Sequence, residues 1–424
     1  MENALWSLVW SVCVIVLLEI ILSNKVNVYC LVKFVFFLII LLLCRPDGLL
    51  WSLIFGILSL FCRWFVYGYD RDFIRVFLFG LIIFFIICFS MLIFRLNYFG
   101  HPLPNTFYAK VSPDTAYNFS QGLRYLARFG LWHCGVILCV PFAVYSFISL
   151  ARAAHGRCCT GTPGDPYILF RGIVGSLVLV GLAVPLLVGG DHFAMFRLMQ
   201  VCWVWLPLPF FLWLWKRQKS GSAKCGSICR GAFVSIGVSV GFLSMEPWIG
   251  LSAQSPIASE FRIAGRDLRT GVLLNQLFPG EEKPVVGVRC AGAIAFSYKG
   301  RVLDLMGLNY VAMAHSPGNR HGKKNHAAFN LDVFWKNPPD VLLPYVSSGV
   351  QELEDGYRLQ RARYLADPLS DPFKGLRLSP EFLGGYTLGA LDDSSGQLLG
   401  GWFRNPLLEE LPPGIRFLPA KISF

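Results

Sequence analysis

The chain has 424 residues, of which 54% are hydrophobic and only 15% are charged. Soluble domains carry about 25% charged residues, so this composition excludes a wholly soluble protein and predicts that much of the chain lies in a membrane. The formal net charge is +12, with Lys and Arg concentrated at the ends of apolar runs, which indicates contact with anionic lipid and not with nucleic acid.

Apolar runs long enough to cross a bilayer occupy residues 1–251. A span needs about 20 residues, and on this basis we expect eight membrane helices, the second and third of them short. Their ranges are Ala4–Leu22, Tyr29–Cys44, Leu49–Val66, Arg75–Phe94, Phe129–Leu150, Tyr167–Val188, Leu198–Trp215 and Gly231–Leu251. The first run lacks a basic leader and a small-residue cleavage site, so we interpret it as a span and not as a signal peptide.

Basic residues in short loops set the expected orientation. The loops assigned to the cytoplasm on this basis are Arg63–Arg75, Ala151–Cys159 and Lys216–Arg230. Alternation then assigns the other loops to the outer side, namely Arg45–Gly48, Arg95–Arg128, Gly189–Arg197 and the chain after Trp248. The same alternation places the N-terminus outside, which indicates either a helix missing ahead of Met1 or a span count that is wrong by one.

The long outer loop is expected to contain a surface helix over residues 113–129. Its apolar residues recur at 3-4-3 spacing, with Ser112 as the predicted N-cap, so the helix would lie on the membrane. We assign it to the transmembrane domain, 1–251.

Residues 252–424 form the second predicted domain, a small extracytoplasmic α/β domain. Strand-like pieces alternate with helical pieces in its first half, and the sequence after Ser348 is dominated by turns. Helices are expected over Ser259–Leu277 and Ala291–Tyr298. Strands are expected over Pro284–Arg289, Arg301–Leu308 and Pro339–Pro344. Cys290 is the only cysteine in this part of the sequence, which excludes a disulfide framework within it.

The outer segments bring together residue types that suit a phosphorylated sugar. Arg45, Lys110 and Arg197 would hold a phosphate. Asp191 would accept a proton from a hydroxyl group. The remaining polar residues of these segments, which would orient the sugar, are Asp47, Asn105, Tyr108 and His192.

Simpler roles for the same residues stay open. Arg45–Gly48 is a good turn sequence, and Lys110 and Arg197 suit contact with lipid headgroups. Asp191 suits a helix N-cap, and His192 beside it would then have no role of its own. No metal site is predicted, although His315, His321 and His326 leave a divalent cation open.

Two outer segments resemble a known family. Residues 97–110 ("NYFGHPLPNTFYAK") and 189–197 ("GGDHFAMFR") are similar to motifs of the polyprenyl-phosphate-dependent glycosyltransferases typified by the mycobacterial terminal β-arabinofuranosyltransferase. The matching residues are Tyr98, Phe99, Gly100, Pro104, Asn105, Thr106, Tyr108, Lys110, Gly189, Gly190, Asp191 and Arg197. The turn Arg45–Gly48 and residues 291–315 extend the similarity, which covers residues 3–345, whereas "GNRHGKKNH" departs from the family order.

The resemblance implies a GT-C fold in a bacterial inner membrane, without a nucleotide cofactor. A polyprenyl-phosphate sugar, such as a pentofuranose, would be transferred with inversion to an extracytoplasmic glycan or protein. Family members carry an acidic pair in their first outer loop, and this sequence starts beyond the matching point, which leaves Asp191 as the candidate base. The alternatives are a catalytically inactive membrane-anchored relative and a lipid-sugar transporter.

Overall fold

The structure is a computed structural model, and the residues that it describes form two compact units. The described ranges are 2–23, 28–45, 47–132, 139–191, 196–199, 205–219, 256–343, 349–393 and 396–421. The first unit, called the helical unit here, comprises Met1–Leu103 and Asn118–Trp248. The second, called the C-terminal unit, comprises Pro104–Tyr117 and Ile249–Phe424. Unlike the predicted domains 1–251 and 252–424, this division groups Pro104–Tyr117 with the C-terminal residues.

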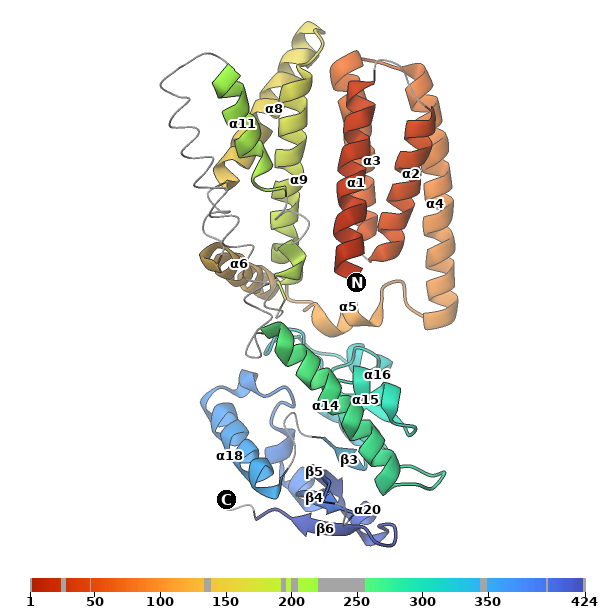
Figure 1. Ribbon diagram of the computed structural model, residues 1–424, viewed down its shortest axis with the longest axis vertical. Helices are drawn as coiled ribbons and strands as arrows, with labels where there is room; N and C mark the ends of the chain where they lie inside the picture. Colours follow the sequence, from red (N-terminus) through yellow and green to blue (C-terminus); the bar gives the residue numbers. More distant parts are fainter. Residues whose placement is uncertain are drawn as a thin grey trace. The chain divides into compact units, whose positions relative to one another are not determined.

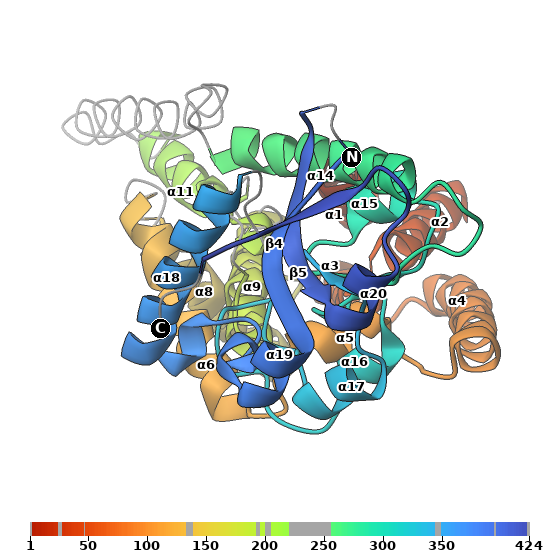
Figure 2. The ribbon, with the colours of Figure 1, turned by 90° about the horizontal axis from the view of Figure 1, so that it is seen from below.

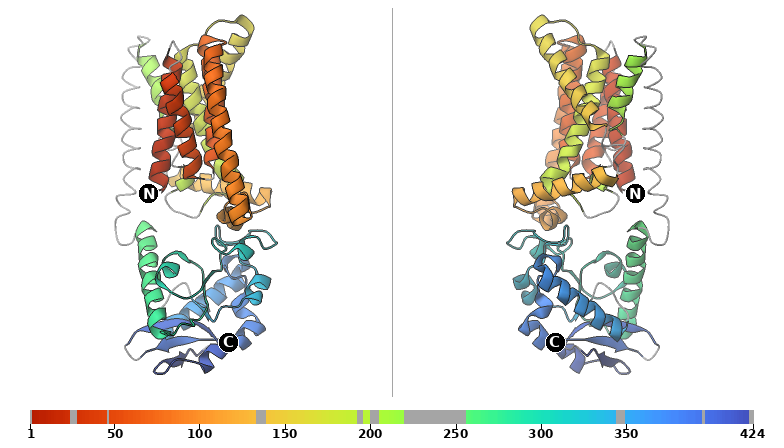
Figure 3. Two further views of the ribbon diagram at one scale, coloured as in Figure 1. Left: turned by 90° about the vertical axis from the view of Figure 1, so that its right-hand side faces the viewer. Right: turned by 90° about the vertical axis from the view of Figure 1, so that its left-hand side faces the viewer.

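The helical unit is built from long apolar helices (Figures 1 and 3). Its described elements are α1 (Glu2–Leu22), α2 (Val28–Cys44), α3 (Gly48–Tyr67), α4 (Arg71–Phe99), α6 (Thr115–Trp132), α8 (Val140–Thr160), α9 (Pro166–Val188), η1 (Arg197–Met199) and α11 (Leu208–Lys219). Four helices (α1, α3, α4 and α9) are long and apolar enough to cross a membrane, and α2 is a shorter apolar helix. The chain is therefore a mostly helical protein with several candidate membrane spans.

Two of the predicted spans take a different form. In place of Phe129–Leu150, α6 ends at Trp132 and α8 runs from Val140 to Thr160. Helix α8 continues past the apolar run because "ARAAHGR" is itself a good helix sequence. In place of Leu198–Trp215, the described residues form η1 and α11, and the predicted span Gly231–Leu251 lies outside the described residues.

A helix is confirmed at the predicted place as α6, and its position on the membrane surface stays a prediction. Its cap differs from the predicted one. The Asp114 carboxylate accepts the amide of Tyr117 at 3.0 Å, whereas the Ser112 hydroxyl accepts only the amide of Asp114, at 3.2 Å. Asp114 therefore caps the first turn because a carboxylate three residues ahead reaches the orphan amide directly.

Successive helices of the helical unit run in opposite directions, so the loops between them lie at its two ends (Figure 1). At one end Arg63 pairs with Asp70, and Lys216 lies 3.6 Å from Asp165 at the start of α9. The turn between α2 and α3 and the segment after α9 lie at the other end. This grouping agrees with the predicted alternation of loops.

The core of the helical unit is aromatic. Trp10 of α1 contacts Trp51 and Phe55 of α3 with ring centroids 5.5 and 5.4 Å apart. Trp205 lies 5.8 Å from the same ring. Helix α4, by contrast, exposes most of its apolar side chains, as a helix in contact with lipid does.

The C-terminal unit is built on a six-stranded sheet in the order β2-β1-β3-β5-β4-β6. The strands are β1 (Val286–Val288), β2 (Val302–Asp304), β3 (Val341–Leu342), β4 (Tyr386–Asp392), β5 (Leu398–Arg404) and β6 (Arg416–Pro419). Strands β1, β2 and β3 are parallel, and the remaining pairs, including β4 with β5 in Figure 2, are antiparallel. The predicted α/β class of the C-terminal unit is therefore confirmed, and its sheet contains both parallel and antiparallel pairs.

Helices cover both faces of this sheet. Leu399 and Phe403 of β5 pack with Leu274 of α14 (Pro256–Leu277) on one face. Trp402 of β5 packs on the other face with α18 (Val350–Ala366). The remaining short helices of the unit are α5 (Asn105–Lys110), α15 (Gly292–Ser297), α16 (Val311–Ala314), α17 (Leu331–Lys336), η2 (Pro368–Ser370), η3 (Leu376–Leu378), α19 (Pro380–Gly385) and α20 (Asn405–Glu409).

The five elements predicted in the first half of this unit are confirmed, with shorter strands than expected. The prediction that turns dominate after Ser348 is wrong. This part of the chain contributes α18 and half of the sheet, β4, β5 and β6.

Candidate functional site

The Pro-Asn-Thr-x-Tyr-x-Lys motif folds as part of the C-terminal unit. Gly100, at φ 74°, ends α4 in the left-handed conformation, and Pro104 then leads into the short helix α5. Asn105, at the first position of α5, donates from Nδ2 to the carbonyl oxygens of Gly307 at 2.8 Å and Leu308 at 3.3 Å. The motif asparagine is thus used to attach the segment to a turn about 200 residues further along the chain.

That turn is organised by Asp304, a buried carboxylate at the end of β2. It accepts the amides of Met306 at 3.1 Å and Asn309 at 2.9 Å, and Gly307 completes the turn at φ 76°. Burial raises the pKa of Asp304, and its amide hydrogen bonds and the charge of Lys110 oppose the rise only in part. Lys110 of the motif is therefore within electrostatic reach of a buried acid.

Tyr108 is fixed by an aromatic and a cationic residue. Its ring lies 4.1 Å from that of His315, and its carbonyl oxygen accepts Nε of Arg320 at 3.1 Å. Arg320 also donates to the carbonyls of Ala314, Ser316 and Gly318 at 2.8–3.1 Å. Burial lowers the pKa of Arg320. The guanidinium is thus held by carbonyl dipoles, which do not cancel its charge.

The end of the same segment is held by a second aromatic pair. Tyr117 stacks on His321 with centroids 4.1 Å apart and exchanges hydrogen bonds with the backbone of Gly322. His321 Nε2 lies 3.0 Å from the Asp114 carboxylate, and the pair is partly exposed. The amide of Tyr117, followed by His321, lowers the pKa of Asp114.

In the helical unit, the predicted polar residues form two ion pairs. Arg45 Nε lies 2.9 Å from Asp47, and its guanidinium lies 5.3 Å from the centre of the Trp6 ring. Arg197 donates from Nε to Asp191, whose side chain is only 3% exposed. Arg197 and burial therefore limit the access of an incoming hydroxyl group to the Asp191 carboxylate.

The glycines of "GGD" explain how that second pair forms. Gly189 and Gly190 both have positive φ, 78° and 69°, and both donate to the carbonyl of Pro185. They end α9 directly before Asp191, which pairs with Arg197. Gly190 also abuts Tyr125 of α6, since a Cβ added there would lie 2.6 Å from the Tyr125 Cβ.

The predicted site residues therefore divide between the two units. The helical unit contains Arg45, Asp47, Asp191 and Arg197, and the C-terminal unit contains Asn105, Tyr108 and Lys110. His192 lies outside the described residues. Sequence reasoning did not identify Asp304, Arg320 or Asp114, and it considered His315 and His321 only as metal ligands.

The described residues contain no group of three His, Cys, Asp or Glu side chains able to hold a metal ion. His315 lies against Tyr108 with its ring tilted by 38°, and His321 stacks on Tyr117. Comparison with known proteins finds no matching family model, no matching curated protein and no matching solved structure.

Proposed function

We propose that this protein is a membrane glycosyltransferase that moves a sugar from a polyprenyl-phosphate donor to an extracytoplasmic glycan or protein. The proposal includes a bacterial inner membrane as its location and a pentofuranose such as arabinose as a candidate sugar. The observation that carries it is the fixed geometry of the Pro-Asn-Thr-x-Tyr-x-Lys segment. A motif of this composition that served only as a loop would not need contacts through Asn105, Tyr108 and Tyr117 to residues some 200 positions away.

The apolar helices support a lipid-linked donor. Four described helices are suited to a bilayer, and α4, which leads directly into the motif segment, is largely exposed along its apolar length. The motif segment thus continues from a helix that would lie among lipid chains. This connection suits a substrate whose phosphate stays at the membrane surface.

The proposed reaction is one inverting displacement. The acceptor oxygen forms a bond to C1 of the sugar, the C1–O bond to the lipid phosphate breaks, and the phosphate leaves with the bonding electron pair. The acceptor proton passes to a base. Lys110 is assigned to the donor phosphate, where its positive charge stabilises the charge that develops on the leaving group, and Asn105 and Tyr108 are assigned to holding the segment in place.

One observation favours an alternative, a catalytically inactive relative. The Asp191 carboxylate, the sole candidate base from the sequence, is buried against Arg197. If no other group takes the proton, the protein would bind a lipid-linked sugar without transferring it. The transporter alternative gains no comparable support from the described residues.

A donor-consumption assay tests the proposal. The full chain is placed in lipid nanodiscs with a labelled polyprenyl-phosphate pentose and a glycan acceptor, and both donor binding and release of polyprenyl phosphate are measured. We expect donor binding and acceptor-dependent release. Lys110→Ala should lower kcat/KM by at least about tenfold, the effect of losing one charge-assisted hydrogen bond.

Lys299→Ala, at an exposed surface position, is the matched control and should leave both measurements unchanged. Binding without release would establish the inactive alternative. No binding by the unmodified chain, or an unaltered kcat/KM in Lys110→Ala, would contradict the assigned role.

A further inference from the structure

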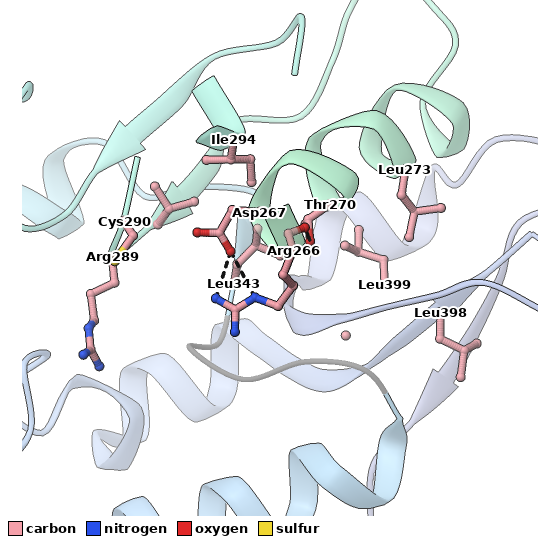
Figure 4. A pocket seen from close by; sticks show the side chains of 12 residues that line it. Arg266, Asp267, Thr270, Leu273, Arg289, Cys290, Ile294, Leu343, Leu398 and Leu399 are labelled. Carbon is pink, nitrogen blue, oxygen red and sulfur yellow. Dashed lines mark hydrogen bonds and ion pairs between the residues drawn. The ribbon is translucent and has the colours of Figure 1, made fainter. Parts of the chain in front are cut away.

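The C-terminal unit contains a cavity that the proposed transfer does not use. It has a volume of about 60 Å³ and is lined by residues of α14, by the segments that follow β1 and β3, and by β5 (Figure 4). A buried water needs about 10–15 Å³ measured in this way, so the space matches roughly four waters or one tetrahedral oxyanion.

The position of the cavity in the sheet is that of a ligand site. The chain passes from β1 to β2 on one side, and β3 then lies on the other side of β1, with all three strands parallel. The strand order therefore reverses between β1 and β3. In open α/β sheets, ligands bind outside the carboxyl ends of the strands at such a switch point. Arg289 and Cys290 follow β1 and Leu343 follows β3, and all three line the cavity.

Charge distinguishes this cavity from a packing void. Arg266 is paired with Asp267 of the same helix at 2.8 and 3.0 Å, so these two side chains neutralise each other. Figure 4 shows Arg289 and Cys290 on one side of the cavity and leucines on the other. Burial, and then the charges of Arg289 and Arg363, lower the pKa of Lys323. The positive charges of Arg289 and Lys323, from two distant parts of the chain, thus act on each other.

We propose that this switch point binds a phosphate group through Arg289, which lines the cavity, with the charge of Lys323 adding to the attraction from outside the lining. A bound dianion would accept charge-assisted hydrogen bonds from Arg289 and would be attracted by both cations. The site does not depend on the proposed transferase activity. Its phosphate could belong to a soluble phosphorylated glycan or to a lipid headgroup, because both present the same group.

Protection of Cys290 from alkylation tests the site. The full chain in neutral detergent is treated with iodoacetamide at increasing inorganic phosphate, with sodium chloride at matched ionic strength as reference, and peptide mass spectrometry follows Cys290. Exposed Cys158 in the helical unit is the internal control. We expect phosphate, and not chloride, to slow alkylation of Cys290 severalfold without affecting Cys158.

Variants identify the residues that bind. Arg289→Gln and Lys323→Gln should each raise the phosphate concentration for half-protection by about tenfold. Arg301→Gln, next to the start of β2 in the same sheet, should leave it unchanged. Each variant is compared with its own rate without phosphate, because burial raises the pKa of Cys290 and the charge of Arg289 opposes that rise. The Lys323 side chain is partly exposed, so its replacement keeps the test valid if Arg289→Gln does not fold.

A second arm distinguishes the two sources of phosphate. The chain is placed in nanodiscs of phosphatidylglycerol or of phosphatidylcholine, without free phosphate. Protection by inorganic phosphate supports a soluble ligand, and protection only in phosphatidylglycerol supports a lipid headgroup. Equal alkylation of Cys290 in every condition would overturn the proposal. So would protection by phosphate in Arg289→Gln and Lys323→Gln that equals the protection in the unmodified chain.

Discussion

The two units of this protein hold their cations in different ways. In the helical unit Arg63, Arg45 and Arg197 each pair with a carboxylate, Asp70, Asp47 and Asp191 respectively. In the C-terminal unit Arg320 is held by four carbonyl oxygens.

The difference follows from the surroundings of each unit. A charge beside apolar helices is expensive unless a counter-ion neutralises it, so a local ion pair is the stable arrangement there. Carbonyl dipoles hold a guanidinium but leave its charge in place, and that charge still attracts an anion. The C-terminal unit also contains the pairs Arg377–Asp371 and Arg266–Asp267, so the contrast concerns Arg320 and the residues around the motif segment.

Breaking the Arg63–Asp70 pair should have the largest effect. Arg63 is 4% exposed, donates to Asp70 at 2.8 and 2.9 Å and to the carbonyl of Ser23, and so connects the ends of α1, α3 and α4. Arg63→Met would leave the Asp70 carboxylate unpaired, and we expect a loss of about 4 kcal/mol. Hydrogen exchange at the first turn of α4 would measure it.

The double variant Arg63→Met/Asp70→Asn sharpens this test. Removing the stranded charge should restore part of the lost stability, because the penalty comes mainly from the unpaired carboxylate. If the double variant loses as much stability as Arg63→Met and Asp70→Asn lose together when measured separately, the two residues do not act as a neutral pair.

Arg320→Met should have the next largest effect, for a different reason. No carboxylate is stranded, but the carbonyls of Tyr108, Ala314, Ser316 and Gly318 lose a donor. At about 1 kcal/mol for each of the two buried carbonyls, those of Ala314 and Ser316, and about 0.5 kcal/mol for each of the two partly exposed ones, we expect a loss of about 3 kcal/mol. The shift of the thermal midpoint, with Arg301→Met as the exposed control, measures it. Rescue of Arg320→Met by removing any nearby carboxylate would contradict the contrast between the units.

Sequence patterns predicted the helices well but missed half of the sheet. The apolar runs of α1, α3, α4 and α9 are dictated by composition alone, since a span needs only length and hydropathy. Strands β4 and β5 contain interior glycines, which lower strand propensity. The structure shows why they are there: a Cβ at Gly400 would lie 2.8 Å from Leu353 of α18, and one at Gly389 would lie 2.4 Å from the backbone of Leu418.

The candidate site was predictable only in part, for a related reason. Asn105, Tyr108 and Lys110 stood out because a polar, proline-containing stretch follows an apolar run. Their partners did not stand out, because Gly307, His315 and Arg320 lie about 200 residues away and have no local pattern. Contacts of this kind depend on tertiary packing, which residue spacing does not encode.

Gly190→Ala tests whether the neutral pair Asp191–Arg197 depends on its backbone turn. The left-handed conformation costs alanine about 1 kcal/mol, and the close contact with Tyr125 adds about the same, so we expect a loss of about 2 kcal/mol. Gly161→Ala is a matched control, because Gly161 has φ 69° with open space around it, and it should lose about half as much. Equal thermal shifts in the two variants would contradict a role for the α6 contact.

The smallest effect is expected at the exposed pair Asp114–His321, and it should appear as a dependence on pH. The pKa of Asp114 is lowered in the folded chain, first by the Tyr117 amide and then by His321. A lowered carboxyl pKa contributes stability above the unfolded value of about 3.9, and that stability is lost as the pH falls through the folded pKa. Hydrogen exchange of residues 104–117 should therefore accelerate, relative to intrinsic rates, below about pH 4.

Asp114→Asn should flatten this pH dependence while keeping an oxygen acceptor for Tyr117. Asp332→Asn, in the exposed first turn of α17, is the matched control and should retain the dependence. The result separates two ways of attaching the motif segment to the C-terminal unit. If the acceleration persists in Asp114→Asn, the segment is held by Asn105, Arg320 and the tyrosine stacks, with no contribution from the charge of Asp114. If it disappears, a partly exposed ion pair adds to the neutral contacts, in contrast to the less exposed pairs of the helical unit.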